Sequence, residues 1–301
     1  MGTEVLTVST SARRLWELVH RPVAIALAEL DGGPHEFRLG GGTALAARWR
    51  HRDSFDIDLV VDRDVQLNEL ANPANPFDHT MRALGGTPDY SHRQCTVTFP
   101  SGQVDLLQVD PVPPGAEHIA VVNGSPALVL DTAQILHGKL ERADKVAVRD
   151  VFDLIKAAEL DPDALAAAVN CRNRRDTEVI AVTFEEANAA LERDARERLV
   201  GAGDINEPET LGTRAATVIR EAVYRHVTVR TEGPSAIIET RTNGGTARRI
   251  EMTHDEIERT MAETGLTRYL GANAFGAHRI RRALQRACTH GEGDQVVWAT
   301  P

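Results

Sequence analysis

The 301-residue sequence contains few aromatic residues, few cysteines and no long hydrophobic run. Aromatic residues make up 4% of the chain and hydrophobic residues 42%, so we expect a core of Ala, Val, Leu and Ile. Cys95, Cys171 and Cys288 have neither the spacing of a zinc site nor the even number of a disulfide framework. No segment has the length of a membrane span, and the N-terminus lacks the apolar centre of a signal peptide. We therefore predict a soluble, cytoplasmic protein that does not bind membranes.

Positive charge is also scarce, because the formal net charge is −10 at pH 7. This balance excludes a general basic surface for nucleic acid. Residues 279–286 form either a local basic patch or an exposed helix face. Lysine occurs only at positions 139, 145 and 156, and arginine supplies the other basic residues. Because an ammonium and a guanidinium differ in geometry and hydration, each of these lysines is a candidate for a specific role.

The most informative segment is residues 39–61, LGGGTALAARWRHRDSFDIDLVV. Asp56 and Asp58 alternate with apolar residues, so in a strand both side chains would project from the same face. Two such carboxylates repel by about 4 kcal/mol at a separation of ~4 Å and an effective dielectric constant of ~20. A divalent cation between them removes this cost, and Mg²⁺ prefers carboxylate oxygens that it shares with substrate phosphates. The pair predicts a metal-dependent phosphoryl or nucleotidyl transfer site.

A glycine turn precedes this acidic pair. Gly41 and Gly42 would let a phosphate approach the main chain, and Thr43 fits the N-cap of a short helix. Free N–H groups at a helix N-terminus attract phosphate. The alternative is a tight strand-to-helix turn followed by a strand with two solvent-facing acids. The order and spacing of the glycine turn and the acidic pair favour a functional site.

A predicted β-hairpin supplies a third acidic candidate. Strands are expected at residues 94–99 and 104–109, joined by a Pro-Ser-Gly-Gln turn. Asp105 lies among apolar residues of the second strand, one strand away from the acidic pair. By itself, Asp105 is typical of a solvent-facing strand residue. Together with the acidic pair, it is interpreted as a third carboxylate with a metal-site or base role.

Helical periodicity begins at residue 131. Lys139 lies on the first of these helices, and Arg149, Asp150 and Asp153 lie on or near one face of the next. One interpretation is a surface ion-pair cluster. The other is that Lys139 binds nucleotide phosphates while Asp150 or Asp153 positions either the lysine or the acceptor.

The remaining patterns predict the order of the other elements. Helices are expected at residues 11–30, 43–50, 77–84, from 131 onward, 147–160, 162–169, 184–199, 253–263 and 274–288. Strands are also expected at residues 35–39, 55–61, 226–230, 236–241 and 247–252, and loops at 66–75 and 200–213. A capping box is predicted at Thr183 with Glu186, and residues 253–256 are predicted to cap the helix that follows them.

The motifs GGTAL, HRDSFDIDL, a lysine-bearing helix and RDVFDL occur in this order. Together they resemble the AbiEii/AbiGii-type nucleotidyltransferase toxins, which belong to the DNA-polymerase-β-like nucleotidyltransferase superfamily. The resemblance covers approximately residues 10–200. It implies a catalytic core with a mixed sheet flanked by helices. Together with the patterns above, this predicts an α+β fold with a helical middle region and a smaller α+β C-terminal part. The expected divisions are residues 1–125 for the catalytic core, 126–200 for a helical region that completes the active site, and 214–301 for a C-terminal region of unknown role.

The resemblance also implies roles for individual residues. The metal ligands would be Asp56 and Asp58, to which the hairpin pattern described above, and not the resemblance, adds Asp105 as a candidate third carboxylate. Lys139 would be the essential lysine and Asp153 the acid that follows it. The nucleotide-binding residues would be Gly41, Gly42, Thr43, Arg52, Ser54, Lys139, Arg149 and Asp150.

The activity implied by the resemblance is transfer of a nucleoside monophosphate from an NTP, with Mg²⁺ or Mn²⁺ as the cofactor. The acceptor would be a tRNA 3′ end, and the toxin would be opposed by a cognate antitoxin protein in abortive infection. Two alternatives stay open. One is nucleotidylation of an aminoglycoside-like small molecule or a protein side chain. The other is an inactive nucleotide-binding module. Family members commonly end in a helical region, whereas residues 214–252 are predicted to contain strands.

Overall fold

The structure is a computed structural model that describes most of the chain. The described residues are 3–30, 35–109, 116–172, 174–199, 210–232, 235–245, 247–253, 256, 283 and 295–299. They form two compact units, the first extending to Asp131 and the second starting at Thr132. Within the described part of the chain, no helix has both the length and the apolar character needed to cross a membrane.

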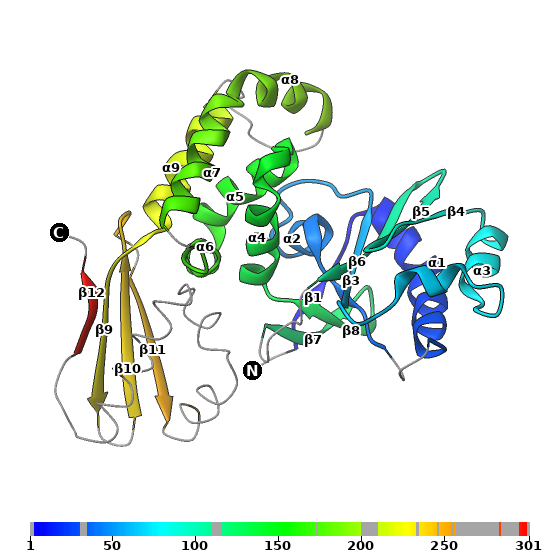
Figure 1. The fold of residues 1–301 in the computed structure, drawn as a ribbon, viewed down its shortest axis with the longest axis horizontal. Coiled ribbons are helices and arrows are strands. Elements are labelled where there is room, and N and C mark those ends of the chain that lie inside the picture. Colours follow the sequence, from blue (N-terminus) through cyan, green and yellow to red (C-terminus); the bar gives the residue numbers. More distant parts are fainter. Residues whose placement is uncertain are drawn as a thin grey trace. The chain divides into compact units, whose positions relative to one another are not determined.

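The first unit is built on a mixed sheet, which has eight strands among the described residues. Its order is β1-β7-β8-β2-β3-β6-β5-β4, with β3 and β6 parallel neighbours near the middle (Figure 1). The strands are β1 (Val5–Leu6), β2 (Arg38–Leu39), β3 (Ile57–Asp62), β4 (Thr87–Tyr90), β5 (Gln94–Phe99), β6 (Gly102–Val109), β7 (Glu117–Val122) and β8 (Ser125–Leu130). The helical segments are α1 (Thr10–Ala28), α2 (Gly41–Trp49), η1 (Leu67–Ala71) and α3 (Phe77–Ala83).

The central strands separate a packed face of the sheet from a polar face. Ile57 and Leu59 of β3 are fully buried, as are Val97 of β5 and Leu106 of β6. Because side chains alternate along a strand, the residues between them point to the other face, and these include half-buried Asp58. Helix α1 packs against β3 and β6. The hydrophobic core therefore supports one face of the sheet and leaves a carboxylate on the other.

Ion pairs hold the two-residue strand β2 in place. The Arg38 Nη1 atom lies 2.9 Å from Asp62 Oδ2, and the same guanidinium pairs with Glu117. Burial opposes the charge on Arg38, but hydrogen bonds to the two carboxylates raise its pKa overall. Strand β2 is thus linked to β3 and β7 by side chains in addition to its short backbone ladders.

A second set of ion pairs anchors the C-terminal end of α2. Arg48 Nε donates to Glu4 Oε1 over 3.0 Å, and His118 Nε2 lies 2.7 Å from Glu4 Oε2. Burial raises the pKa of Glu4, but the hydrogen bonds from Arg48 and His118 outweigh it and lower the pKa overall. These contacts connect α2 with the β1 end of the sheet.

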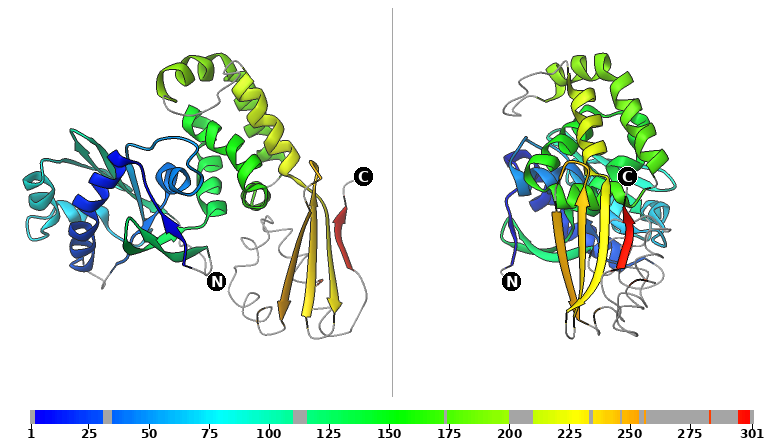
Figure 2. Two further views of the ribbon diagram at one scale, coloured as in Figure 1. Left: turned by 180° about the vertical axis from the view of Figure 1, so that it is seen from behind. Right: turned by 90° about the vertical axis from the view of Figure 1, so that its left-hand side faces the viewer.

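The second unit starts with a group of helices. These are α4 (Thr132–Glu141), η2 (Ala143–Lys145), α5 (Val148–Leu160), α6 (Pro162–Asn170), α7 (Arg174–Glu186), α8 (Asn188–Arg198) and α9 (Leu211–Ala222). Among the residues described, they are followed by a four-stranded antiparallel sheet in the order β11-β10-β9-β12 (Figure 2). Its strands are β9 (Tyr224–Glu232), β10 (Ser235–Thr242), β11 (Ala247–Thr253) and β12 (Gln295–Ala299).

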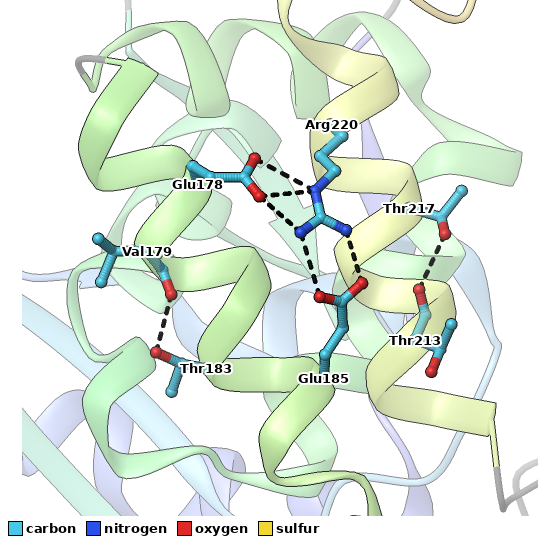
Figure 3. A network of polar contacts seen from close by, with 7 residues as sticks. All are labelled: Glu178, Val179, Thr183, Glu185, Thr213, Thr217 and Arg220. Atoms are coloured by element: carbon cyan, nitrogen blue, oxygen red, sulfur yellow. Dashed lines mark hydrogen bonds and ion pairs between the residues drawn. The ribbon is translucent and has the colours of Figure 1, made fainter.

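One arginine joins α7 to α9. Figure 3 shows Arg220 of α9 between Glu178 and Glu185 of α7. Its Nη1 and Nη2 atoms each lie 2.6 Å from a carboxylate oxygen, and its Nε also donates to Glu178. Hydrogen bonding to Glu185 and then Glu178 raises the pKa of Arg220. A planar guanidinium suits such paired contacts because its donors form a rigid fork.

The predicted α+β fold is confirmed, with local corrections. The helices expected at residues 11–30 and 77–84, the hairpin and the three strands between residues 226 and 252 are all present. The capping box at Thr183 is wrong, because Thr183 lies inside α7 and its hydroxyl donates to Val179 O over 2.8 Å. The helix expected at 184–199 consists of the end of α7 followed by α8.

Other predictions near the two loops and the C-terminus had mixed outcomes. The loop at 66–75 contains the short helix η1, and α9 starts at Leu211, within the expected linker. The cap expected at residues 253–256 has reciprocal contacts, since Thr253 N donates to Glu256 Oε2 over 2.8 Å and Glu256 N donates back to Thr253 Oγ1 over 3.3 Å. The rest of the helix expected at 253–263, the helix at 274–288 and the basic segment 279–286 lie outside the described residues, apart from Ala283.

Candidate active site

The glycine turn connects β2 to α2, and three residues set its geometry. Gly40 is the N-cap residue of α2, and no side chain caps this end of the helix. Gly41 has φ +56°, a left-handed conformation that glycine adopts without the steric cost of a Cβ atom. The prediction that Thr43 is the N-cap is therefore wrong, because Thr43 is the third residue of the helix. The N–H groups of the first turn point out of the helix end, where they favour negative charge.

The glycines allow two polar side chains to approach the turn. A Cβ atom on Gly41 would lie 2.1 Å from Asp58 Oδ2, and one on Gly42 would lie 2.3 Å from Arg52 Nη2. Both distances are too short for a real carbon atom, so the space above each glycine is occupied by a charged group. Arg52 is largely buried, and its Nη1 donates to Asp53 O over 3.2 Å. The backbone of the turn is thus adjacent to a carboxylate and a guanidinium.

Buried hydroxyls tie the turn to the segment that leads into β3. Thr43 is fully buried, its Oγ1 lies 3.0 Å from Ser54 Oγ, and it donates to Asp56 O. The backbone N of Gly40 donates to Asp58 O over 2.9 Å. The strand expected at residues 55–61 begins only at Ile57, so Asp56 lies outside β3 and, contrary to the prediction, the pleat does not place its side chain on the same face as that of Asp58. These hydrogen bonds connect the glycine turn to the acidic segment.

Strand register brings Asp105 next to Asp58. The two residues are Cα partners in the parallel pairing of β3 and β6, so their side chains lie on the same face of the sheet. The Asp105 carboxylate accepts three hydrogen bonds, from Gln94 Nε2 at 3.0 Å, Thr96 Oγ1 at 2.6 Å and Gln103 Nε2 at 2.7 Å. The hairpin thus contributes an acid that is held firmly beside the acidic segment.

The donor chemistry of Asp56 and Asp58 fits a divalent cation. Carboxylate oxygens are hard ligands, and Mg²⁺ is usually bound by one or two carboxylates together with substrate phosphates and water. In the part of the chain that the structure describes, no group of three or more His, Cys, Asp and Glu side chains is arranged to hold a metal ion. The fit therefore depends on phosphate oxygens completing the shell. Because Gly41 has no Cβ atom, the Asp58 carboxylate can lie directly against the start of α2, whose N–H groups favour negative charge.

The second unit contains the lysine cluster. Lys139 of α4 is 3% exposed, its Nζ lies 2.9 Å from Asp153 Oδ2, and it also pairs with Asp150, both acids being on α5. Asp153 is fully buried, whereas Arg149 is exposed on the same helix. The structure thus shows ion pairs between Lys139 and the two acids, and the lysine is buried rather than on the surface. A lysine fixed by two acids is pre-organised, and its removal leaves one fully buried and one half-buried carboxylate without their shared cation.

Three residues that donate hydrogen bonds to Asp105 were not identified from the sequence. Gln94, Thr96 and Gln103 hold Asp105, and none of them was singled out as a candidate. A signal was present, because these polar residues alternate with buried Cys95 and Val104 along the hairpin. Polar residues at every second position mark one face of a strand. Only the register of β5 against β6 shows that this face converges on a single carboxylate.

Comparison with known protein families identifies a match that spans both units. The family model described as nucleotidyl transferase AbiEii toxin, type IV TA system, matches residues 25–217, which is more than half of the chain. No curated protein matches the sequence significantly. The matched range includes the glycine turn, the acidic segment, the hairpin and the lysine cluster.

Proposed function

Because the chain belongs to the AbiEii family of nucleotidyltransferase toxins of type IV toxin–antitoxin systems, we propose that it transfers a nucleoside monophosphate from an NTP to the 3′ end of a tRNA. The observation that carries the proposal is the contact between Gly41 and Asp58. A left-handed glycine at an uncapped helix start lies directly against a carboxylate. This arrangement can bind a phosphate and a cation side by side.

The proposed site residues of the first unit have separate tasks in this reaction. Asp56 and Asp58 would hold Mg²⁺ or Mn²⁺, and such an ion would neutralise negative charge on the triphosphate. The N–H groups at Gly41 to Thr43 bind phosphate oxygens, with Arg52 as a neighbouring positive charge and Ser54 supporting the turn through Thr43.

The reaction is an in-line displacement. The acceptor hydroxyl oxygen forms a bond to the α-phosphorus, the bond to the bridging oxygen breaks, and pyrophosphate leaves. Asp105 accepts the hydroxyl proton, which then passes to solvent. Its place beside Asp58 supports this role, because a base must lie within hydrogen-bond reach of the proton it takes.

We assign Lys139 to the β- and γ-phosphates, with Asp150 and Asp153 positioning its ammonium and Arg149 adding charge nearby. The ion pairs of Lys139 support the positioning role. Because of these ion pairs, Lys139→Ala is not a clean test of the proposed role in phosphate binding. Breaking a buried pair from one side costs about 3–5 kcal/mol, so Lys139→Ala is expected to destabilise the helical unit. Lys139→Arg, which keeps the charge, and Lys139→Met combined with Asp153→Asn are better variants.

The test is transfer of label from each α-³²P-NTP, with Mg²⁺, to total tRNA, cell protein and an aminoglycoside. We expect label on tRNA from the wild type and none from Asp58→Asn, which is similar in size. Asp64→Asn is the matched control, since Asp64 is an exposed acid that follows β3. Label only on protein or the aminoglycoside would refute the tRNA acceptor. No label in any pool would refute the enzymatic proposal and favour a nucleotide-binding module.

The toxin role has a separate test in cells. Expression of the wild type should arrest growth, and expression of Asp58→Asn should not. Co-expression with the product of an adjacent antitoxin gene should restore growth, because a type IV system implies such a partner. Increased aminoglycoside resistance without growth arrest would instead indicate a small-molecule acceptor.

A further inference from the structure

The side chains around Asp105 form a row across the polar face of the sheet. Asp58 of β3, Asp105 of β6 and Thr96 of β5 are successive Cα partners in adjacent strands. Gln94 and Gln103 each lie two residues before a member of this row, so the pleat places them on the same face. All five side chains are half-buried. The row thus joins a proposed metal ligand to a proposed base and then to uncharged groups.

Hydrogen bonds within the row orient the Thr96 hydroxyl. Gln94 Nε2 donates to Thr96 Oγ1 over 2.9 Å, and Thr96 Oγ1 lies 2.6 Å from Asp105 Oδ1. An ionised carboxylate only accepts, so the Thr96 proton points at Asp105. The second proton of the Gln94 amide serves Asp105 as well, at 3.0 Å. Gln94 therefore fixes Asp105 Oδ1 in two ways. It donates to this oxygen directly, and it orients the Thr96 hydroxyl that donates to the same oxygen.

These hydrogen bonds limit how many further donors or metal ions the Asp105 carboxylate can bind. A carboxylate offers about four lone-pair positions, and three donors occupy all but one of them. A carboxylate in this state can take one more hydrogen bond, but it cannot bind a metal ion through both oxygens. The donors are also uncharged, so they add no cation that would repel Mg²⁺ at the neighbouring Asp58.

We propose that Gln94, Thr96 and Gln103 are positioning residues that fix Asp105 with one lone pair directed to the acceptor hydroxyl. This inference rests on the proposed nucleotidyl transfer. The three residues do not touch the reacting atoms. They act by keeping Asp105 in one orientation, so that the hydroxyl proton is accepted along a fixed direction while its oxygen attacks the α-phosphorus.

The test uses Thr96→Val, which removes the hydroxyl but keeps the shape and the β-branched side chain. We expect kcat to fall roughly tenfold to a hundredfold, the effect of one hydrogen bond to a charged group, with KM for the NTP unchanged. Thr96→Ser should restore most of the rate. Thr98→Val is the control, because Thr98 lies on the same face of β5 but is not a donor to Asp105. In an Asp105→Asn background, Thr96→Val should have little further effect on kcat.

Further readouts distinguish the possible outcomes. Affinity for Mn²⁺, measured by electron paramagnetic resonance, should be the same in Thr96→Val and the wild type. A loss of Mn²⁺ affinity would overturn the inference, because Asp105 would then be a metal ligand. Equal rates for Thr96→Val and Thr98→Val, or no rescue by serine, would also overturn it. If the wild type transfers no label, the proposed function itself fails, which is a different result from an active wild type with an active Thr96→Val variant.

Discussion

Replacing Gly41 with alanine tests the central contact of the site. The new Cβ would lie 2.1 Å from Asp58 Oδ2, whereas real Cβ contacts stay above 3.0 Å. The carboxylate or the turn must therefore move by about 0.9 Å or more. A misplacement of ~1 Å can cost on the order of 100-fold in rate, so we expect that loss in nucleotidyl transfer. Mn²⁺ affinity should fall as well, because the displaced group is a proposed ligand.

Gly41→Ala also introduces backbone strain, which needs its own control. An alanine in the left-handed region costs about 1–2 kcal/mol. Gly124 has φ +88°, and a Cβ atom added there would have no neighbour within 4 Å, so Gly124→Ala has strain without a clash. Urea denaturation should show a similar loss of stability in both variants, with transfer lost only in Gly41→Ala. Wild-type transfer by Gly41→Ala, with stability equal to that of Gly124→Ala, would refute the assignment of Asp58.

Three further predictions concern stability and reactivity. Arg220→Gln removes the guanidinium whose hydrogen bonds lower the pKa values of two glutamates on α7. The wild type should therefore melt at a higher temperature than the variant above about pH 4.3, and this difference should disappear as the pH falls further. Thr43→Val should lower the free energy of unfolding in urea by about 1–3 kcal/mol, because buried oxygens lose their partner, whereas Thr43→Ser should lose less. Burial raises the pKa of Cys95 to about 12, so with Cys171 and Cys288 replaced by serine, iodoacetamide should modify the protein only after unfolding, as followed by mass spectrometry.

The sequence predicted the order of the site's motifs better than their detailed geometry. The glycine turn, the short helix and the acidic segment follow one another as expected. Thr43 was misplaced because its hydroxyl finds buried partners in Ser54 and Asp56, which a local capping rule does not include. The pairing of Asp105 with Asp58 depends on the parallel register of two strands far apart in the sequence. Local patterns carry no information about such a register.

The fold was predictable where hydrophobic periodicity was strong. Helix α1 and the β5–β6 hairpin have clear patterns and lie close to their expected bounds. Strand β1 has only two residues, too few to show alternation, and of the strand expected at residues 35–39 only Arg38–Leu39 forms β2. Helix α7 was missed, because a threonine and a glutamate near its end imitate a helix start. Such errors follow from competition between local signals and tertiary packing.

The place of β2 in the sheet has a consequence for protein synthesis. This strand carries the glycine turn and lies between β3 and β8, which ends at Leu130. With two residues, it has little stability without both neighbours. A nascent chain that ends before β8 contains both aspartates but lacks one of the strands that shape the turn. We therefore expect polypeptides from interrupted translation to be inactive, so that toxicity requires synthesis beyond residue 130.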